Sequence, residues 1–251
     1  MKDKQRVLLQ KCIAEFAGTM LLTFSILSSI TSTAVSYTNV VWTHGFAIFN
    51  LALIFGPISG GHFNPAVTLA FLLRLKDRIS FFDCICYMSA QLFGGIIAGF
   101  LNHGMFSKYY LDLPKAANDS NNIAPLANWD SDNLGSINMF FFEALGTALL
   151  VLTVLMSSNK NNIFIRDASS SFFGAIAIAG MITWIGFMGI LYYAGINPAR
   201  ELGPRIAGAC IYGGSVAFVP YAWIPILGPF AGAIVATVVF EAISRMYGTS
   251  V

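Results

Sequence analysis

Charged side chains are scarce in this sequence of 251 residues. Asp, Glu, Lys and Arg together make up 10% of it, whereas a soluble globular domain carries about 25%. No formally charged residue occurs between Phe16 and Leu73, and the mean hydropathy is +0.69. The net charge of +2 forms no basic stripe, which argues against nucleic-acid binding. The composition therefore predicts a membrane protein that does not bind nucleic acid.

Catalytic and metal-binding signatures are also missing. The sequence contains no P-loop, no His-Glu-x-x-His helix and no Ser-His-Asp signature. The Cys84-x-Cys86 pair is too closely spaced for a usual zinc site and lacks partner ligands. We expect no enzymatic activity, no metal site and no cofactor.

Apolar segments take up most of the chain. A helix needs about 20 apolar residues to cross a bilayer, and the charge-free runs provide six segments of about that length. The expected fold is an all-α, multi-pass membrane protein, with six transmembrane helices near residues 12–35, 39–59, 81–103, 138–158, 170–191 and 219–243.

Two further apolar stretches, near 64–73 and 197–208, are too short to cross a bilayer. Each begins with an Asn-Pro-Ala motif, Asn64-Pro65-Ala66 and Asn197-Pro198-Ala199. Because proline is favoured at the first position of a helix, each stretch is predicted to be a re-entrant half-helix. Irregular backbone at such a depth is tolerated only when it is buried in protein or lines a wet cavity.

The sequence repeats itself with a nearly constant offset. Glu15 corresponds to Glu143, 128 residues later, and the Asn-Pro-Ala motifs lie 133 residues apart. Gly94 corresponds to Ala231 in a third match, Phe93-Gly94-Gly95 with Phe230-Ala231-Gly232. Each copy holds three spans and one half-helix, and an odd number of spans turns the second copy over. We expect one domain over 1–251 built as an inverted repeat, with copies at about 10–103 and 138–245 and a connecting loop at about 104–137.

Basic residues predict the orientation in the membrane. Ten of the fourteen Lys and Arg residues fall on one side of the predicted topology. By the positive-inside rule both termini are cytoplasmic and the 104–137 loop is extracellular. The membrane is expected to be the plasma membrane or an internal, vacuole-like one.

The repeated motif predicts chemistry suited to a neutral solute. Two half-helices from opposite faces would meet with their N-termini at the midplane, where their dipoles place partial positive charge. Asn64 and Asn197 would donate hydrogen bonds there, and the positive midplane would oppose cations and protons. Carbonyls of the extended stretches before the motifs would accept hydrogen bonds from the solute, with candidates at Gly60, Gly61, His62, Tyr193, Ala194 and Gly195.

Two carboxylates lie within predicted spans, which is costly and points to a defined role. Glu15 and Glu143 each precede a glycine by one helical turn. Each could accept hydrogen bonds from the N–H groups of a re-entrant loop, and a proton relay is the alternative. His62 is expected to brace its own loop.

These motifs closely resemble those of the aquaporin, or major intrinsic protein, family over about residues 10–245. The resemblance implies a right-handed six-helix bundle in lipid, with one pore per chain and assembly as a homotetramer. It also places a selectivity filter near the outer mouth, formed by His44, Ile185, Ala194 and Arg200.

The resemblance gives mixed signals about the solute. The filter residues are similar to those of plant tonoplast-type channels, whereas the run from Arg200 to Arg205 and the pair Pro225-Ile226 are similar to those of glycerol facilitators. We expect a passive channel for water and small uncharged solutes such as glycerol, urea or ammonia, closed to ions and protons. The alternative is a structural or junctional membrane protein with the same fold and a pore of low permeability.

Overall fold

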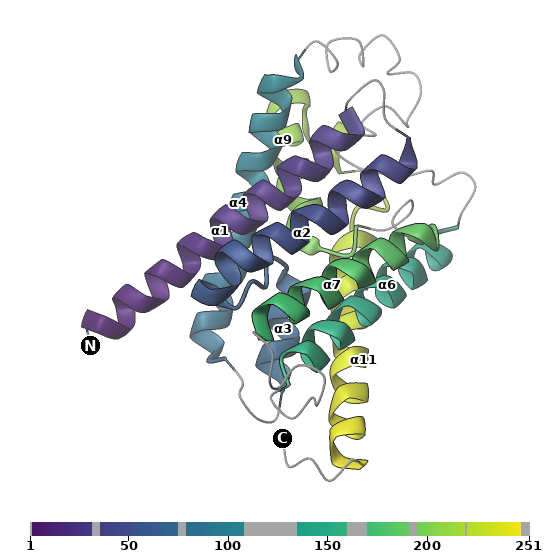
Figure 1. Ribbon diagram of the computed structural model, residues 1–251. Coiled ribbons are helices and arrows are strands. Elements are labelled where there is room, and N and C mark those ends of the chain that lie inside the picture. The colour runs from purple at the N-terminus through teal and green to yellow at the C-terminus, as the bar shows by residue number, and fades with distance from the viewer. Residues whose placement is uncertain are drawn as a thin grey trace.

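The computed structural model describes residues 2–31, 36–74, 79–107, 135–159, 170–190, 195–218 and 220–246. Within these ranges the chain is helical and contains no strand. The expected all-helical fold is confirmed (Figure 1). Five of the described helices are long and apolar enough to cross a membrane: α1 (Lys2–Thr31), α2 (Tyr37–Ser59), α4 (Phe81–Met105), α6 (Ser136–Ser157) and α11 (Ile224–Met246). A further apolar helix, α7 (Ser170–Phe187), is shorter and packs against α2 and α6.

Two shorter helices begin at the Asn-Pro-Ala motifs, α3 (Pro65–Leu73) and α9 (Pro198–Tyr212). The side-chain oxygen of Asn64 accepts a hydrogen bond from the backbone N–H of Ala66 at 2.9 Å. Asn197 accepts the equivalent bond from Ala199 at 3.1 Å. An asparagine N-cap followed by proline at the first helical position is a strong helix start, so the motif itself sets where each half-helix begins. A single turn, α10 (Gly214–Ala217), follows α9.

The two halves of the chain pack in the same way and interlock. α1 packs against α2 and α4, just as α6 packs against α7 and α11. Each half-helix crosses to the other half, so that α9 packs against α4 and α3 packs against α11. The N-terminal end of α1 and the C-terminal end of α11 lie at the same end of the bundle (Figure 1).

The register of the repeat differs by one residue from the sequence match in the last helix of each copy. A Cβ atom added at Gly94 would overlap the carbonyl oxygen of Phe16, and one added at Gly232 would overlap that of Ala144. Phe16 and Ala144 are themselves related by the 128-residue offset. Gly232, and not Ala231, is therefore the counterpart of Gly94, because both glycines let two helices approach closely.

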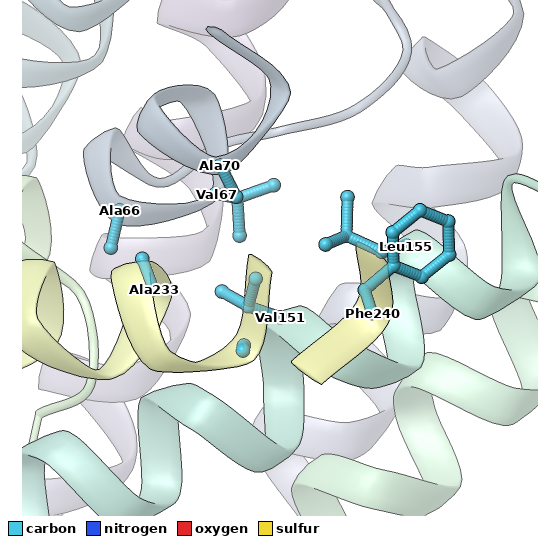
Figure 2. Packing of buried hydrophobic residues seen from close by; sticks show 8 residues of the cluster. Ala66, Val67, Ala70, Val151, Leu155, Ala233 and Phe240 are labelled. Atoms are coloured by element: carbon cyan, nitrogen blue, oxygen red, sulfur yellow. The ribbon is translucent and has the colours of Figure 1, made fainter. Parts of the chain in front are cut away.

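The first half-helix is held by apolar packing. Its small residues face α6 and α11 (Figure 2), and close packing of such side chains gains dispersion energy as well as burial. The packed residues are Ala66, Val67 and Ala70 with Val151, Leu155, Ala233, Ala236 and Phe240.

Several helix boundaries differ from those expected. α1 begins at Lys2 and not near residue 12, because Lys, Gln, Arg and Leu in its first turns are good helix formers. The polar residues before residue 12 set the start of the predicted apolar span, but the helix itself begins ten residues earlier, at Lys2. α9 extends to Tyr212 and not to 208, and α11 begins at Ile224 and not at 219.

Candidate functional site

The two half-helices meet through a reciprocal pair of hydrogen bonds. The side-chain amide of Asn64 donates to the carbonyl of Ile196 at 2.8 Å. The amide of Asn197 donates to the carbonyl of Phe63, also at 2.8 Å. Each bond joins one motif to the residue directly before the other motif, so the two copies of the repeat are linked at their helix N-termini.

Phe63 and Ile196 hold the left-handed backbone that this crossing requires. Their φ angles are 48° and 49°, a region that bulky residues rarely adopt and that carries strain. Both side chains are buried against a glycine: a Cβ atom on Gly18 would overlap the Phe63 ring, and one on Gly146 would lie 2.8 Å from Ile196 Cγ2. Sequence reasoning missed both residues, because a positive φ at a bulky residue leaves no mark in the sequence.

A narrow cavity lies along the two motifs. Apolar side chains of α1, α2, α3, α6 and α7 form most of its wall, and it has about 30 Å³ of space for water molecules. A single water needs about 10–15 Å³ measured in this way, so the cavity has room for about two or three water molecules. The polar groups on its wall come from His44, Gly61, His62, Asn64 and Asn197.

The asparagine amides are arranged to act on a solute in this cavity. Each amide nitrogen carries two N–H groups and uses one in the crossing. Within the described part of the chain the second N–H has no hydrogen-bond acceptor, so one donor on each asparagine remains for the cavity.

Glu15 is the centre of a buried network beneath the first re-entrant loop. It is fully buried, and its two oxygens accept from the backbone N–H groups of His62 at 2.9 Å and Phe63 at 2.7 Å. Ser59 Oγ donates at 2.6 Å and Gln91 Nε2 at 2.8 Å. Four donors fill the lone pairs of one carboxylate, a geometry that favours loop bracing over a proton relay.

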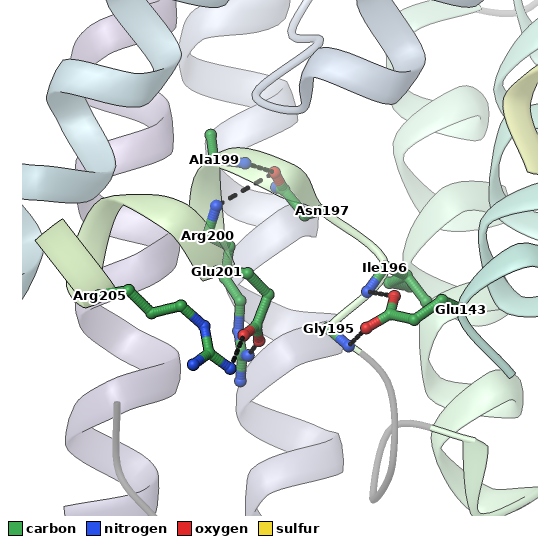
Figure 3. A network of polar contacts seen from close by, with 8 residues as sticks. All are labelled: Glu143, Gly195, Ile196, Asn197, Ala199, Arg200, Glu201 and Arg205. Atoms are coloured by element: carbon green, nitrogen blue, oxygen red, sulfur yellow. Dashed lines mark hydrogen bonds and ion pairs between the residues drawn. The ribbon is translucent and has the colours of Figure 1, made fainter. Parts of the chain in front are cut away.

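Glu143 contacts the second loop in the same manner but with fewer partners. Its oxygens accept from the N–H groups of Gly195 at 2.9 Å and Ile196 at 2.8 Å. Figure 3 shows the carboxylate pointing at both N–H groups. Glu15 therefore binds the N–H of Phe63, and Glu143 binds the N–H of Ile196. The carbonyls of these two residues accept the hydrogen bonds from Asn197 and Asn64.

His62 contacts its own half-helix through a hydrogen bond and through stacking of its ring. Its Nδ1 lies 3.1 Å from Thr68 Oγ1. That hydroxyl also lies 3.1 Å from the carbonyl of Asn64 and accepts a hydrogen bond from Gln91 Nε2 at 2.9 Å. The ring stacks on Phe71 with centroids 4.5 Å apart. His62 is also one of the residues that line the cavity.

The expected filter residues occupy different environments. His44 lies on the cavity wall, 6% exposed. Ile185 is fully buried in a cluster with Leu150, Ile182 and Ile190, and the cavity wall on α7 comes from Ile178 and Ile182. Arg200 is buried beside Glu201 and is not among the described residues that line the cavity. Ala194 lies outside the described residues.

The backbone carbonyls that are expected to accept hydrogen bonds from a solute are also distributed unevenly. Gly61 and His62 lie at the cavity wall. Gly60 caps the end of α2 with a φ of 94°, and Gly195 is held through its N–H by Glu143. Tyr193, like Ala194, lies outside the described residues.

Two inverted Asn-Pro-Ala half-helices define the architecture, and the asparagine of each donates to the carbonyl directly before the other motif. A family comparison gives this architecture a name. Residues 2–240 match the family model described as major intrinsic protein. The chain belongs to the major intrinsic protein family. It is therefore a membrane channel of the family that contains aquaporins and glycerol uptake facilitators.

Similar proteins come from both branches of the major intrinsic proteins. Glycerol uptake facilitator protein-like 6 of Lactiplantibacillus plantarum is 32% identical, over 91% of this chain and 95% of its own length. Probable aquaporin PIP2-7 of Oryza sativa is 29% identical over 93% of this chain and 78% of its own. The X-ray structure of the aquaglyceroporin from Plasmodium falciparum superposes with a TM-score of 0.76 at 20% identity, covering 97% of this chain and all of that one. The structural match supports the fold.

Proposed function

We propose that the chain is a passive pore for water and at least one small uncharged solute, glycerol, urea or ammonia. The observation that carries the proposal is the asparagine crossing, which leaves one N–H of Asn64 and one of Asn197 facing a narrow cavity. An apolar wall with a few polar groups suits a solute that has both apolar and hydrogen-bonding surfaces.

Exclusion of ions and protons is the second part of the proposal. The N-termini of α3 and α9 point at the same place and direct partial positive charge into it. Both asparagines act there as donors, so a hydronium or a metal cation would meet donors where it needs acceptors. His44, which lies on the described cavity wall, would add a further polar group on the path of the solute.

Orientation and assembly follow from charge and from the family. Lys4 and Arg6 in the first turns of α1 and Arg245 in the last turn of α11 are exposed. These two helix ends lie at the same end of the bundle (Figure 1), which supports cytoplasmic termini. Homotetramer assembly with one pore per chain, in the plasma membrane or a vacuole-like one, is proposed from family membership.

Permeability of reconstituted protein tests the function. Stopped-flow light scattering of proteoliposomes should show water flux, and flux of at least one of the three solutes, above that of empty liposomes of the same lipid. A pH-sensitive dye inside the same vesicles should report no proton leak above that control. Water flux without any solute flux would refute the solute range, and absence of both would favour the structural alternative.

A further inference from the structure

A buried arginine lies at the end of the first half-helix. Arg74 directly follows α3, and its backbone N–H donates to the carbonyl of Ala70 at 3.1 Å. The residue is 4% exposed. Within the described part of the chain no carboxylate pairs with Arg74, and its Nε makes no hydrogen bond. Because a buried charge is costly unless it is compensated, other groups must stabilise this guanidinium.

Two phenylalanine rings take the place of a carboxylate partner. The guanidinium carbon of Arg74 lies 5.6 Å from the centroid of the Phe71 ring and 5.2 Å from that of the Phe240 ring. Both distances fall within the range of about 6 Å over which the face of an aromatic ring attracts a cation. Phe71 belongs to α3 and Phe240 to α11. One cation therefore joins the end of the half-helix to a long helix of the other copy of the repeat.

The second copy of the repeat holds its half-helix in a different way. The 133-residue offset between the motifs relates Ala70 to Gly203 and Arg74 to Ala207. A Cβ atom added at Gly203 would overlap the backbone of Gly95, so α9 and α4 touch through two glycines. At the corresponding places of the first copy, α3 carries the methyl group of Ala70 and is followed by the long side chain of Arg74. The cation therefore fixes the end of a half-helix that lacks the glycine contact of its counterpart.

The Phe71 ring connects this cation to the cavity. The imidazole of His62 stacks on Phe71, with ring centroids 4.5 Å apart and an angle of 13° between the ring planes. His62 is one of the residues that line the cavity. Phe71 therefore contacts both the imidazole at the cavity and the guanidinium of Arg74. Because stacked rings keep a preferred mutual arrangement, a shift of the Phe71 ring would also move the imidazole.

We propose that Arg74 is a positioning residue whose cation fixes the Phe71 ring, holds the His62 imidazole in place through it, and so keeps the passage beside His62 narrow. The proposal deepens the channel function proposed above and rests on it. Without the cation, the Phe71 ring would lose an attractive contact, and the imidazole stacked on it would move more freely. The wider passage would favour glycerol over water, because the smaller molecule already fits the cavity.

Two substitutions of Arg74 separate its charge from its packing. Arg74→Met removes the cation and keeps a long apolar side chain, and it should raise the ratio of glycerol to water permeability several-fold in proteoliposomes of matched protein density. Arg74→Lys keeps a cation for the two rings and should leave the ratio near that of the unmodified protein. Arg6→Met, the same change at an exposed residue of α1, is the control and should leave the ratio unchanged. No rise in Arg74→Met, or an equal rise in Arg74→Lys, would overturn the proposal.

A chemical measurement tests the positioning role even in a protein that conducts neither solute. Diethyl pyrocarbonate modifies accessible imidazoles, and peptide mass spectrometry measures the adduct on His62 relative to that on His103 in the last turn of α4. Arg74→Met should raise this relative modification about tenfold, the factor that corresponds to about 1.4 kcal/mol. Phe240→Leu, which removes one ring and keeps the cation, should raise it in the same direction. An unchanged value in either variant would overturn the positioning role, whereas a lack of conduction in the unmodified protein would overturn only the channel proposal.

Discussion

Asn64 reaches across the molecule to the residue directly before Asn197, and Asn197 reaches back to the residue directly before Asn64, with both bonds 2.8 Å long. The crossing ties two segments more than 130 residues apart in the sequence. The crossing also orients both side-chain amides. Because an amide group is planar, a hydrogen bond that fixes one N–H also fixes the direction of the second.

Replacing either asparagine by aspartate should damage the protein to a similar extent. In Asn64→Asp a carboxylate oxygen would face the Ile196 carbonyl, leaving a buried acceptor unpaired at a cost of about 1–3 kcal/mol. Thermal unfolding in detergent should show the same loss for Asn64→Asp and Asn197→Asp. Asn39→Asp, on the exposed first turn of α2, is the matched control, and a loss no larger than that of the control would contradict the role of the crossing.

The two buried glutamates should differ in their contribution to stability. Glu15→Gln introduces an NH₂ group among four donors, whereas Glu143→Gln does so between two. Because each unmet buried donor costs about 1–3 kcal/mol, Glu15→Gln should lower the unfolding temperature more than Glu143→Gln. Equal unfolding temperatures for the two variants would show that the additional contacts of Glu15 carry no weight.

Positions 182 and 185 on α7 should respond differently to added volume. Ile182 lies on the cavity wall, whereas Ile185 lies only within the apolar cluster. Ile182→Phe should therefore reduce glycerol flux, with a smaller loss of stability than at Ile185, because part of the added volume enters the cavity. Ile185→Phe should overpack the cluster and cost about 1–3 kcal/mol. Stopped-flow light scattering measures the glycerol flux of both variants, and thermal unfolding measures their stability. Loss of glycerol flux in Ile185→Phe, with the larger loss of stability in Ile182→Phe, would place Ile185 at the pore.

Mercurials should not inhibit water flux in the unmodified protein. None of the four cysteines, Cys12, Cys84, Cys86 and Cys210, lies on the described cavity wall. Ala194→Cys should create sensitivity that a thiol reductant reverses, since the family resemblance places position 194 in the filter. Strong reversible inhibition without this substitution would mean that one of the four thiols controls the pore.

Local signals in the sequence were sufficient for much of the architecture. The length of the apolar runs predicted the spans, since a helix must cover the thickness of the bilayer. Asn-Pro-Ala predicted where α3 and α9 begin, because capping uses atoms within three residues of the asparagine. The repeat also identified Glu15 and Glu143 as candidates for binding the N–H groups of the re-entrant loops.

Tertiary structure decided which atoms meet. α7 is apolar on all sides, so no periodicity in its sequence tells which face lines the cavity, and only packing against α2 and α6 places Ile182 there and Ile185 in the core. The positive φ angles of Phe63 and Ile196 and the pairing of Glu201 with Arg200 likewise depend on neighbours brought close by folding. The sequence by itself determined the membrane class, the inverted repeat and the helix starts, because these depend on length and short-range hydrogen bonds. The rotation of each helix about its axis, and with it the lining of the pore, depends on close packing among helices that are nearly all apolar.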